Sequence, residues 1–171
     1  MQSIFFDAST LILLAKVGLL ERFFAAWKGN VLVTPMVATE AWGQKASPEV
    51  AELSRRASAG DLRVQAVDDQ RSCQALREDF SLGPGEAETI WAASRQSNAV
   101  VATDDRLAIR ACRTLGVPWT SALSIVILMH ERQLLTRDLA QGFLKALSVH
   151  GRYHREVMAD AEKRLGKGTN R

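Results

Sequence analysis

Long apolar runs and cysteines are scarce in this chain of 171 residues, and each absence excludes a class of protein. No apolar run approaches the length of a membrane-spanning helix, and the start of the chain lacks a basic segment followed by an apolar one. We therefore expect a cytoplasmic protein with no membrane partner. The two cysteines, Cys73 and Cys112, have no metal-ligating neighbour at short spacing, so we expect reduced, buried thiols.

Internal repeats and low-complexity stretches are also absent, which excludes a solenoid and a long disordered segment. What is present is an ordinary globular composition, 47% hydrophobic and 24% charged, at a length that fits one domain. The net charge is +3, and residues 150–171 carry six basic and three acidic side chains, so the rest of the chain is neutral overall. A charge this small does not identify a nucleic-acid-binding protein by itself.

Short apolar runs alternate with helical patterns along the chain. The apolar runs predict five strands, over residues 3–6, 31–33, 62–67, 99–103 and 117–119. Helices are predicted between and after them, the first capped by Ser9 and the others over 19–27, from Pro35 onward, and over 48–59, 69–80, 86–97, 106–115, 121–132, 137–148 and 153–165. Strands separated by helices of this length imply a parallel sheet with helices on both faces, which is an α/β fold.

Acidic residues stand where this fold would turn from strand to helix. Asp7 directly follows the first predicted strand and Asp104 the fourth, and three further acids accompany them: Glu40, Glu86 and Asp105. The carboxyl ends of parallel strands meet at one edge of the sheet, and functional residues gather there. Because carboxylates repel one another, several of them in one crevice need a divalent cation to offset the repulsion. Such a site can activate water and stabilise the leaving oxygen of a phosphodiester.

Each acid also has a structural interpretation. Asp7 and Asp104 could cap helices, and the helix dipole favours Glu86 in a first helical turn. The joint placement of the acids at strand ends is what favours the functional interpretation. Glu88 lies about 200° round the helix from Glu86, so we predict that it is a surface residue.

Three arginines, Arg106, Arg110 and Arg113, fall on one face of the helix that follows the acidic doublet. Our hypothesis is that they bind RNA phosphates beside the acidic site, since backbone contacts supply affinity without sequence information. The alternative is a solvated helix face.

The acidic positions and their neighbours resemble the PIN-domain nucleases over residues 2–135. The segments that carry the resemblance are Phe6-Asp7-Ala8-Ser9, Thr39-Glu40, Gly83-Pro84-Gly85-Glu86-Ala87-Glu88 and Val100-Val101-Ala102-Thr103-Asp104-Asp105. The chain departs from the family pattern with Glu86 at the third acidic position and a doublet at the fourth. The resemblance implies a PIN-like three-layer sandwich over residues 1–135, in which a five-stranded parallel sheet is flanked by helices. Residues 136–165 would form extra C-terminal helices on or beside the same domain, and residues 166–171 a frayed tail.

The resemblance also implies a site and an activity. The cofactor would be Mg²⁺ or Mn²⁺, and the Ser9 hydroxyl would orient the attacking water. The implied metal ligands are Asp7, Glu86, Asp104 and Asp105, and the implied catalytic carboxylates are Asp7, Glu40, Glu86 and Asp104. The activity would be metal-dependent hydrolysis of RNA phosphodiester bonds. Many small members of the family are toxins of toxin–antitoxin pairs, which implies RNA, a small antitoxin protein and a second copy of the chain as partners.

Two other functions stay open at this point. A haloacid-dehalogenase-like phosphatase also begins with an Asp after a strand and ends with an acidic doublet, but it needs a second Asp where this chain has Ser9. The other alternative is a non-catalytic PIN-like module that binds RNA or protein.

Overall fold

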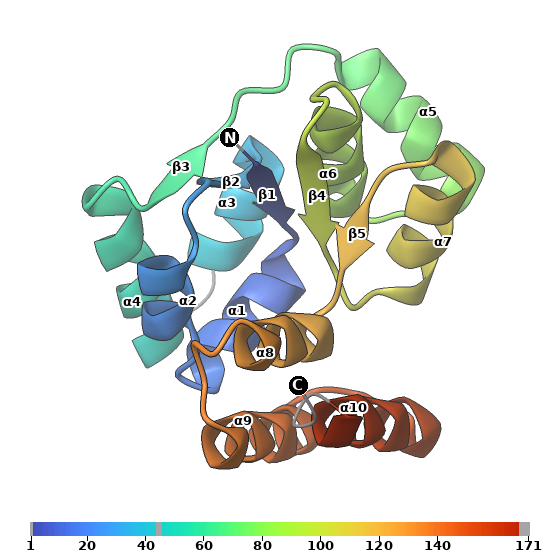
Figure 1. Ribbon diagram of the computed structural model, residues 1–171. Helices are drawn as coiled ribbons and strands as arrows, with labels where there is room; N and C mark the ends of the chain where they lie inside the picture. The colour runs from blue at the N-terminus through green and yellow to red at the C-terminus, as the bar shows by residue number, and fades with distance from the viewer. Residues whose placement is uncertain (1, 44–45, 168–171) are drawn as a thin grey trace.

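The computed structural model describes residues 2–43 and 46–167, and over these residues five strands alternate with ten helices (Figure 1). The strands are β1 (Ser3–Phe6), β2 (Asn30–Val33), β3 (Leu62–Val64), β4 (Ala99–Ala102) and β5 (Trp119–Thr120). The helices are α1 (Ala8–Lys16), α2 (Leu20–Ala26), α3 (Pro35–Trp42), α4 (Pro48–Ser58), α5 (Gln70–Phe80), α6 (Pro84–Ser94), α7 (Arg106–Leu115), α8 (Ala122–Glu131), α9 (Arg137–His150) and α10 (Arg155–Lys167). None of the helices in these ranges has both the length and the apolar character that a membrane span requires.

The five strands form one parallel sheet in the order β3-β2-β1-β4-β5, which confirms the predicted fold class. β1 lies between β2 and β4, and its residue Phe5 pairs with Leu32 on one side and Val101 on the other. The chain builds outward from β1 to β3 and then returns to place β4 on the opposite side of β1. The strand order therefore reverses between β1 and β4. Ligand sites of open parallel sheets lie at such a reversal, beyond the carboxyl ends of the strands.

Both faces of the sheet are covered, because its central strands carry apolar side chains on both sides. Every residue of β1 is buried; Ile4 and Phe6 join one hydrophobic core, and Phe5 joins the other. The first core continues into α1, α2, α4 and α8, and the second continues into α6 and α7. Successive side chains of a strand point to opposite faces, so a strand buried on both faces needs the continuous apolar run seen in the sequence.

The C-terminal helices α9 and α10 lie side by side at one end of the molecule, next to α8 (Figure 1). Leu144 and Leu147 of α9 and Ala161 and Leu165 of α10 are buried in the same core cluster as α1 and α8. The two helices thus extend the first core and do not form a separate core of their own.

Two predicted strand boundaries are wrong at the edges of the sheet. β3 ends at Val64 and not at residue 67, because its only neighbour, β2, ends at Val33. β5 begins at Trp119 and not at residue 117, because the Val117 amide bonds to the Cys112 carbonyl at the end of α7. An edge strand is paired on one side only, so its length follows that of its single neighbour.

Several helix boundaries also differ from the prediction, including the start of α6 and both ends of α10. α6 begins at Pro84 and not at Glu86, since proline lacks an amide hydrogen and fits the first position of a helix. α10 spans Arg155–Lys167 and not residues 153–165, so residues 166 and 167 of the predicted frayed tail are helical. The rest of that predicted tail, residues 168–171, lies outside the described residues.

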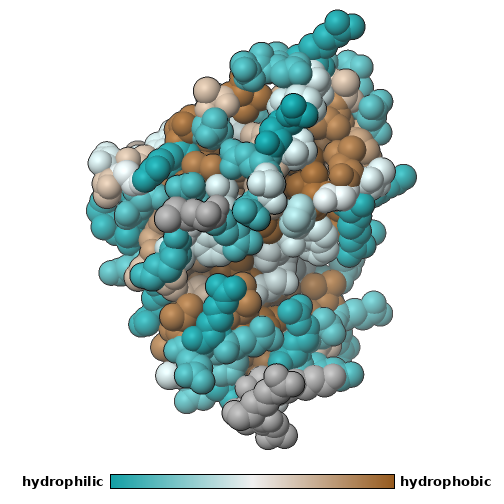
Figure 2. Space-filling model, turned by 45° about the horizontal axis from the view of Figure 1, so that its top comes forward, coloured by the Kyte–Doolittle hydropathy of each residue, from teal (hydrophilic) through white to brown (hydrophobic). Residues whose placement is uncertain are grey.

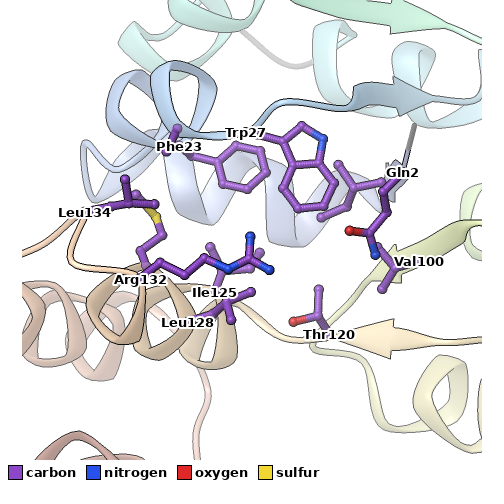
Figure 3. Close-up of a pocket in the computed structure, with 12 residues that line it drawn as sticks. Gln2, Phe23, Trp27, Val100, Thr120, Ile125, Leu128, Arg132 and Leu134 are labelled. Atoms are coloured by element: carbon purple, nitrogen blue, oxygen red, sulfur yellow. The ribbon is translucent and has the colours of Figure 1, made fainter. Parts of the chain in front are cut away.

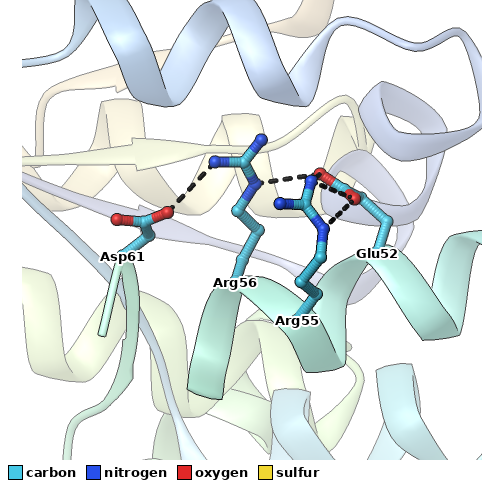
Figure 4. A network of polar contacts seen from close by, with 4 residues as sticks. All are labelled: Glu52, Arg55, Arg56 and Asp61. Atoms are coloured by element: carbon cyan, nitrogen blue, oxygen red, sulfur yellow. Dashed lines mark hydrogen bonds and ion pairs between the residues drawn. The ribbon is translucent and has the colours of Figure 1, made fainter. Parts of the chain in front are cut away.

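A buried arginine ties α4 to the start of β3 (Figure 4). Arg56 is 9% exposed, and its guanidinium lies 2.9 Å from Glu52 Oε1 and 3.0 Å from Asp61 Oδ2. Its Cζ also lies 5.1 Å from the centroid of the Phe24 ring, while Arg55 bonds to the Glu52 carboxylate from the exposed side of α4. A buried guanidinium is tolerated only when it is paired, so this network is structural.

Large hydrophobic side chains that remain exposed are scattered over several elements. The most exposed are Val149 at 72%, Val64 at 53% and Val157 at 47%, in α9, β3 and α10. On the face drawn in Figure 2, hydrophobic residues reach the surface in several separate patches between hydrophilic ones. Exposed apolar residues scattered in this way are normal for a folded domain and mark no particular partner.

Candidate active site

Asp7 occupies the first position after β1, where its carboxylate caps α1. Its backbone is extended, and Oδ1 accepts hydrogen bonds from the Thr10 amide at 2.7 Å and the Ser9 hydroxyl at 3.2 Å. The prediction that Ser9 caps this helix is therefore wrong, because Asp7 is the cap and Ser9 already belongs to the first turn. Capping uses only one carboxylate oxygen. The other, Oδ2, is buried without a hydrogen-bond partner, and Asp7 is only 3% exposed.

Asp104 is linked to the same turn of α1 through Thr10. The Thr10 hydroxyl donates to Asp104 Oδ2 at 3.2 Å and accepts from the Asp104 amide at 3.0 Å. The amide of Ala122, the first residue of α8, also donates to Oδ2 at 3.2 Å. One threonine thus contacts Asp7 through its backbone and Asp104 through its side chain. The two strand-end aspartates are brought together, as their placement after neighbouring strands predicts.

Asp105 has the capping role that the sequence left open for Asp104. Its Oδ1 accepts hydrogen bonds from the amides of Leu107 at 2.7 Å and Ala108 at 2.9 Å, at the start of α7. The two members of the acidic doublet therefore differ: Asp105 holds a helix end, and Asp104 faces α1.

Glu86 and Glu40 approach the site from α6 and α3. Glu86 is the third residue of α6, and its Oε2 accepts the Gly83 amide at 2.8 Å, which is one half of a capping box because Gly83 has no side chain to make the other bond. Glu40 is exposed, and its Oε1 accepts the Gly85 amide at 3.2 Å. A Cβ on Gly85 would lie 2.8 Å from Glu40 Oε2, so a side chain there would displace the Glu40 carboxylate.

The carboxylates lie close enough to affect one another's pKa. Burial raises the pKa of Asp7 from 3.8 to about 6, and the charge of Asp104 contributes to the rise. Burial also raises the pKa of Asp104. The pKa of Glu86 is raised by burial and then by the charges of Asp105, Asp7 and Glu40. The structure therefore gathers all five predicted acids into one negative region.

A cavity of about 440 Å³ opens beside these carboxylates. Its lining residues come from α1, the start of α6, the acidic doublet and the link between α9 and α10: Ser9, Thr10, Leu13, Glu86, Asp104, Asp105, His150, Gly151, Arg152 and Tyr153. Asp7 does not line it directly but holds Ser9 and Thr10, which do. We call this space the acidic cavity.

A second cavity, of about 130 Å³, lies between α2 and α8 and has a different character (Figure 3). Phe23 and Trp27 form one wall, Ile125 and Leu128 lie opposite, and the Arg132 side chain reaches between them. Its lining contains no carboxylate, histidine or cysteine. This apolar cavity has no group that could bind a hard cation or activate water, so the acidic cavity is the candidate active site.

The acidic cavity meets only part of what a divalent cation requires. Across residues 2–43 and 46–167 there is no group of three or more acidic, histidine or cysteine side chains in position to hold a metal ion. Mg²⁺, however, is commonly held by one or two carboxylates and keeps several waters or substrate phosphates as its other ligands. The buried, unpartnered Oδ2 of Asp7 and the adjacent Asp104 meet that smaller requirement.

Glu88 contradicts the prediction that it is a surface residue. It is 4% exposed; its Oε2 accepts the Met36 amide at 3.0 Å, and its Oε1 accepts the Gln70 side-chain amide at 3.2 Å. The prediction assumed that the side of α6 opposite Glu86 faces water, but α6 is buried on nearly all sides, between α3, α5 and α7. Glu88 accepts a hydrogen bond from a backbone amide in the first turn of α3 and does not line the acidic cavity.

The arginine stripe lies on the exposed side of α7. Arg106, Arg110 and Arg113 are all exposed, and the Arg113 Cζ lies 5.2 Å from the centroid of the Trp119 ring. Arg106 directly follows the acidic doublet, so the stripe begins at the acidic cavity and extends roughly 10 Å away from it along the helix. None of the three side chains belongs to the lining of the cavity.

Three residues at the site were missed from the sequence: Thr10, Gly85 and Tyr153. Thr10 had a visible signal in the sequence, since it is a polar residue among the apolar residues of α1. The structure leaves this residue 1% exposed. Gly85 was taken only as part of a turn. Tyr153 had no local signal, because its position depends on how α9 and α10 pack against the rest of the chain.

A parallel α/β sheet with carboxylates clustered where the strand order reverses does not identify the class of protein by itself. A family model described as a PIN domain matches residues 3–167, and the chain belongs to the PIN-domain family. The match includes α9 and α10 as well as the sheet. None of the curated proteins compared with the chain matches it. PIN domains are generally nucleases and typically use divalent metal ions, so this membership removes the haloacid-dehalogenase-like phosphatase from the alternatives.

Proposed function

We propose that the chain is a metal-dependent ribonuclease that hydrolyses RNA phosphodiester bonds in the acidic cavity. The observation that carries the proposal is the pairing of Asp7 and Asp104 through Thr10, with one buried Asp7 oxygen left without a partner. A divalent cation bound there, magnesium or manganese, supplies an activated water and stabilises negative charge on the leaving oxygen. RNA as the substrate is supported by the resemblance to PIN nucleases and by the exposed arginines of α7, the helix that follows the acidic doublet.

Each residue has a defined part in this proposal. Asp7 Oδ2 and the Asp104 carboxylate would hold the cation, while the Ser9 hydroxyl and the Thr10 amide keep Asp7 Oδ1 in place. Glu86 and Asp105 line the cavity, where their carboxylates would accept hydrogen bonds from water bound beside them. Glu40 adds negative charge from α3, next to Gly85.

The direct test is cleavage of a labelled single-stranded RNA by the purified protein. We expect cleavage in magnesium or manganese, none in excess chelator, and recovery when the metal is restored. Water attack leaves the neighbouring ribose hydroxyl unused, so the products should lack cyclic phosphate ends. Cleavage that survives the chelator, or that leaves cyclic phosphates, would come from a contaminating ribonuclease. Binding of RNA without any cleavage would support the non-catalytic module instead.

The arginine stripe is tested by reversing one charge. We expect Arg110→Glu to weaken binding of single-stranded RNA about tenfold at low salt, because it removes a cation from the phosphates and adds repulsion. The slope of log affinity against log salt concentration should become shallower by about 0.7 for each phosphate that the variant no longer neutralises. Arg22→Glu on α2 is the matched control, since Arg22 is also exposed and does not line the acidic cavity. Equal affinities and slopes for the two variants would leave the stripe as a solvated helix face.

A more specific role is included in the proposal: toxin of a toxin–antitoxin pair, acting as a homodimer and bound by a small antitoxin protein. This role is supported by the resemblance to small PIN nucleases. A gene for a small DNA-binding protein beside the gene for this chain would strengthen it. Growth arrest on expression, relieved by that neighbour, would test it.

A further inference from the structure

The link between α9 and α10 reaches the acidic cavity from the far end of the sequence. His150, Gly151, Arg152 and Tyr153 all line the cavity. The Tyr153 ring packs against the first hydrophobic core, and its hydroxyl is buried without a hydrogen-bond partner within 3.5 Å. A buried hydroxyl without a partner costs free energy, so it calls for an explanation.

The backbone at Gly151 allows the Tyr153 ring to occupy this position. The Gly151 amide bonds to the Leu147 carbonyl at 2.7 Å and ends α9. A Cβ at Gly151 would overlap the Tyr153 ring and would lie 2.9 Å from the Leu147 carbonyl oxygen. A glycine two residues before the tyrosine therefore lets the ring fold back over the end of α9, toward the cavity.

The charge that acts most on the Tyr153 hydroxyl is that of Asp104. Burial raises the pKa of Tyr153, and the Asp104 carboxylate raises it further, ahead of Asp7. On its other side, Asp104 Oδ2 is held by the Thr10 hydroxyl and the Ala122 amide. Donors from α1 and α8 thus hold one side of this carboxylate, and the Tyr153 hydroxyl lies near enough to interact with it but has no hydrogen-bond partner within 3.5 Å.

We propose that Tyr153 is a positioning residue of the metal centre: its hydroxyl donates a hydrogen bond to Asp104 when that carboxylate binds the divalent cation, and so holds Asp104 in its ligating orientation. Ligating carboxylates are commonly fixed by such outer donors, whose loss costs about 10–100-fold in metal affinity or activity. An ionised carboxylate accepts hydrogen bonds more strongly than a protonated one. Ionised Asp104 would therefore give the Tyr153 hydroxyl the hydrogen-bond partner that it lacks. The proposal rests on the proposed function, and it makes the C-terminal helices a part of the active site.

The first experiment uses the fact that Tyr153 is the only tyrosine of the chain. Protein labelled with ¹³C at the tyrosine Cζ gives a single NMR resonance, and its chemical shift reports the hydrogen bonding of the hydroxyl. We expect this resonance to shift as magnesium is added and to stay fixed in Asp104→Asn. No RNA and no turnover enter the measurement.

The second experiment measures magnesium affinity from the dependence of thermal unfolding on magnesium concentration. We expect Tyr153→Phe to weaken magnesium binding about tenfold and to lower kcat with little change in KM for RNA. Without metal, Tyr153→Phe should be at least as stable as the wild type, because it removes an unpartnered hydroxyl. Thr89→Val is the matched control, since the Thr89 hydroxyl is also buried without a partner but does not line the acidic cavity.

The possible results separate this proposal from the proposed function. A magnesium-dependent resonance shift in a protein that does not cleave RNA supports the role of Tyr153 and overturns the ribonuclease. Stabilisation by magnesium with an unmoved resonance and an unchanged affinity in Tyr153→Phe overturns the role of Tyr153 alone. A wild-type protein that magnesium neither stabilises nor shifts overturns both. A metal-free Tyr153→Phe that is less stable than the wild type shows a structural partner for the hydroxyl and also overturns the proposal.

Discussion

Replacing Asp7 by asparagine is expected to reduce RNA cleavage by at least ~10²–10³-fold, the range for losing one electrostatic group of an active site. The same change should make the metal-free protein more stable. Asparagine caps helices as well as aspartate does, so the bond from the Thr10 amide is kept. What is removed is a buried negative charge that has no partner for one of its oxygens. A substitution that abolishes function and stabilises the fold identifies a residue kept for activity.

The size of the gain follows from the pKa of Asp7. A carboxyl whose pKa rises from 3.8 to about 6 on folding destabilises the folded state, once ionised, by up to about 3 kcal/mol. The raised pKa means that the folded protein binds the proton more tightly than the unfolded chain. The metal-free wild type therefore becomes more stable as the pH falls from above 6 toward 4. The advantage of Asp7→Asn should be largest above pH 6 and should shrink over that interval.

The measurement is thermal or denaturant unfolding of both proteins in chelator, at several pH values, followed by the same scans in magnesium. Magnesium should raise the midpoint of the wild type and leave that of Asp7→Asn unchanged, because the cation binds only the intact site. An Asp7→Asn protein that is less stable at neutral pH, or equally stabilised by magnesium, would contradict this account of the buried carboxylate.

Replacing Thr10 by valine is expected to damage both stability and activity. Valine keeps the shape of threonine but removes the hydroxyl that bonds to the carboxylate and to the amide of Asp104. Losing a bond to a charged group and leaving an amide without its partner costs about 2–4 kcal/mol. For a chain of this length the unfolding midpoint should fall by about 5–15 °C. Cleavage should fall about 10–100-fold, because Asp104 is no longer held toward Asp7.

Thr89→Val provides a matched control for this substitution. Thr10 and Thr89 are both helical threonines, 1% and 0% exposed, but the Thr89 hydroxyl has no hydrogen-bond partner. Its removal should leave stability unchanged or increase it, and cleavage should stay at the wild-type level. Equal losses in the two variants would mean that the loss comes from changing a buried helical threonine, and not from the bond to Asp104.

The acidic cavity illustrates how far local sequence patterns reach. The strand-end positions of Asp7 and Asp104 follow from apolar runs that stop at an acid, and parallel strands bring such ends together. The choice of capping residue did not follow, because Ser9, Asp7 and Asp105 all have side chains able to cap, and the backbone conformation decides between them. Glu88 was misplaced because helical periodicity separates two faces of a helix without saying whether either face meets solvent.

The sequence by itself determined the class of fold, the order of most of its elements, and the acids at the strand ends, because these depend on periodicity, turn chemistry and chain order. Only the tertiary structure decided which groups meet across long stretches of chain. Strand order placed β4 beside β1, which lets Thr10 hold Asp104, 94 residues away. The packing of α9 and α10 onto α8 brought Tyr153 to the same carboxylate. Such contacts depend on the summed burial of many side chains, and no short segment of the sequence carries that information.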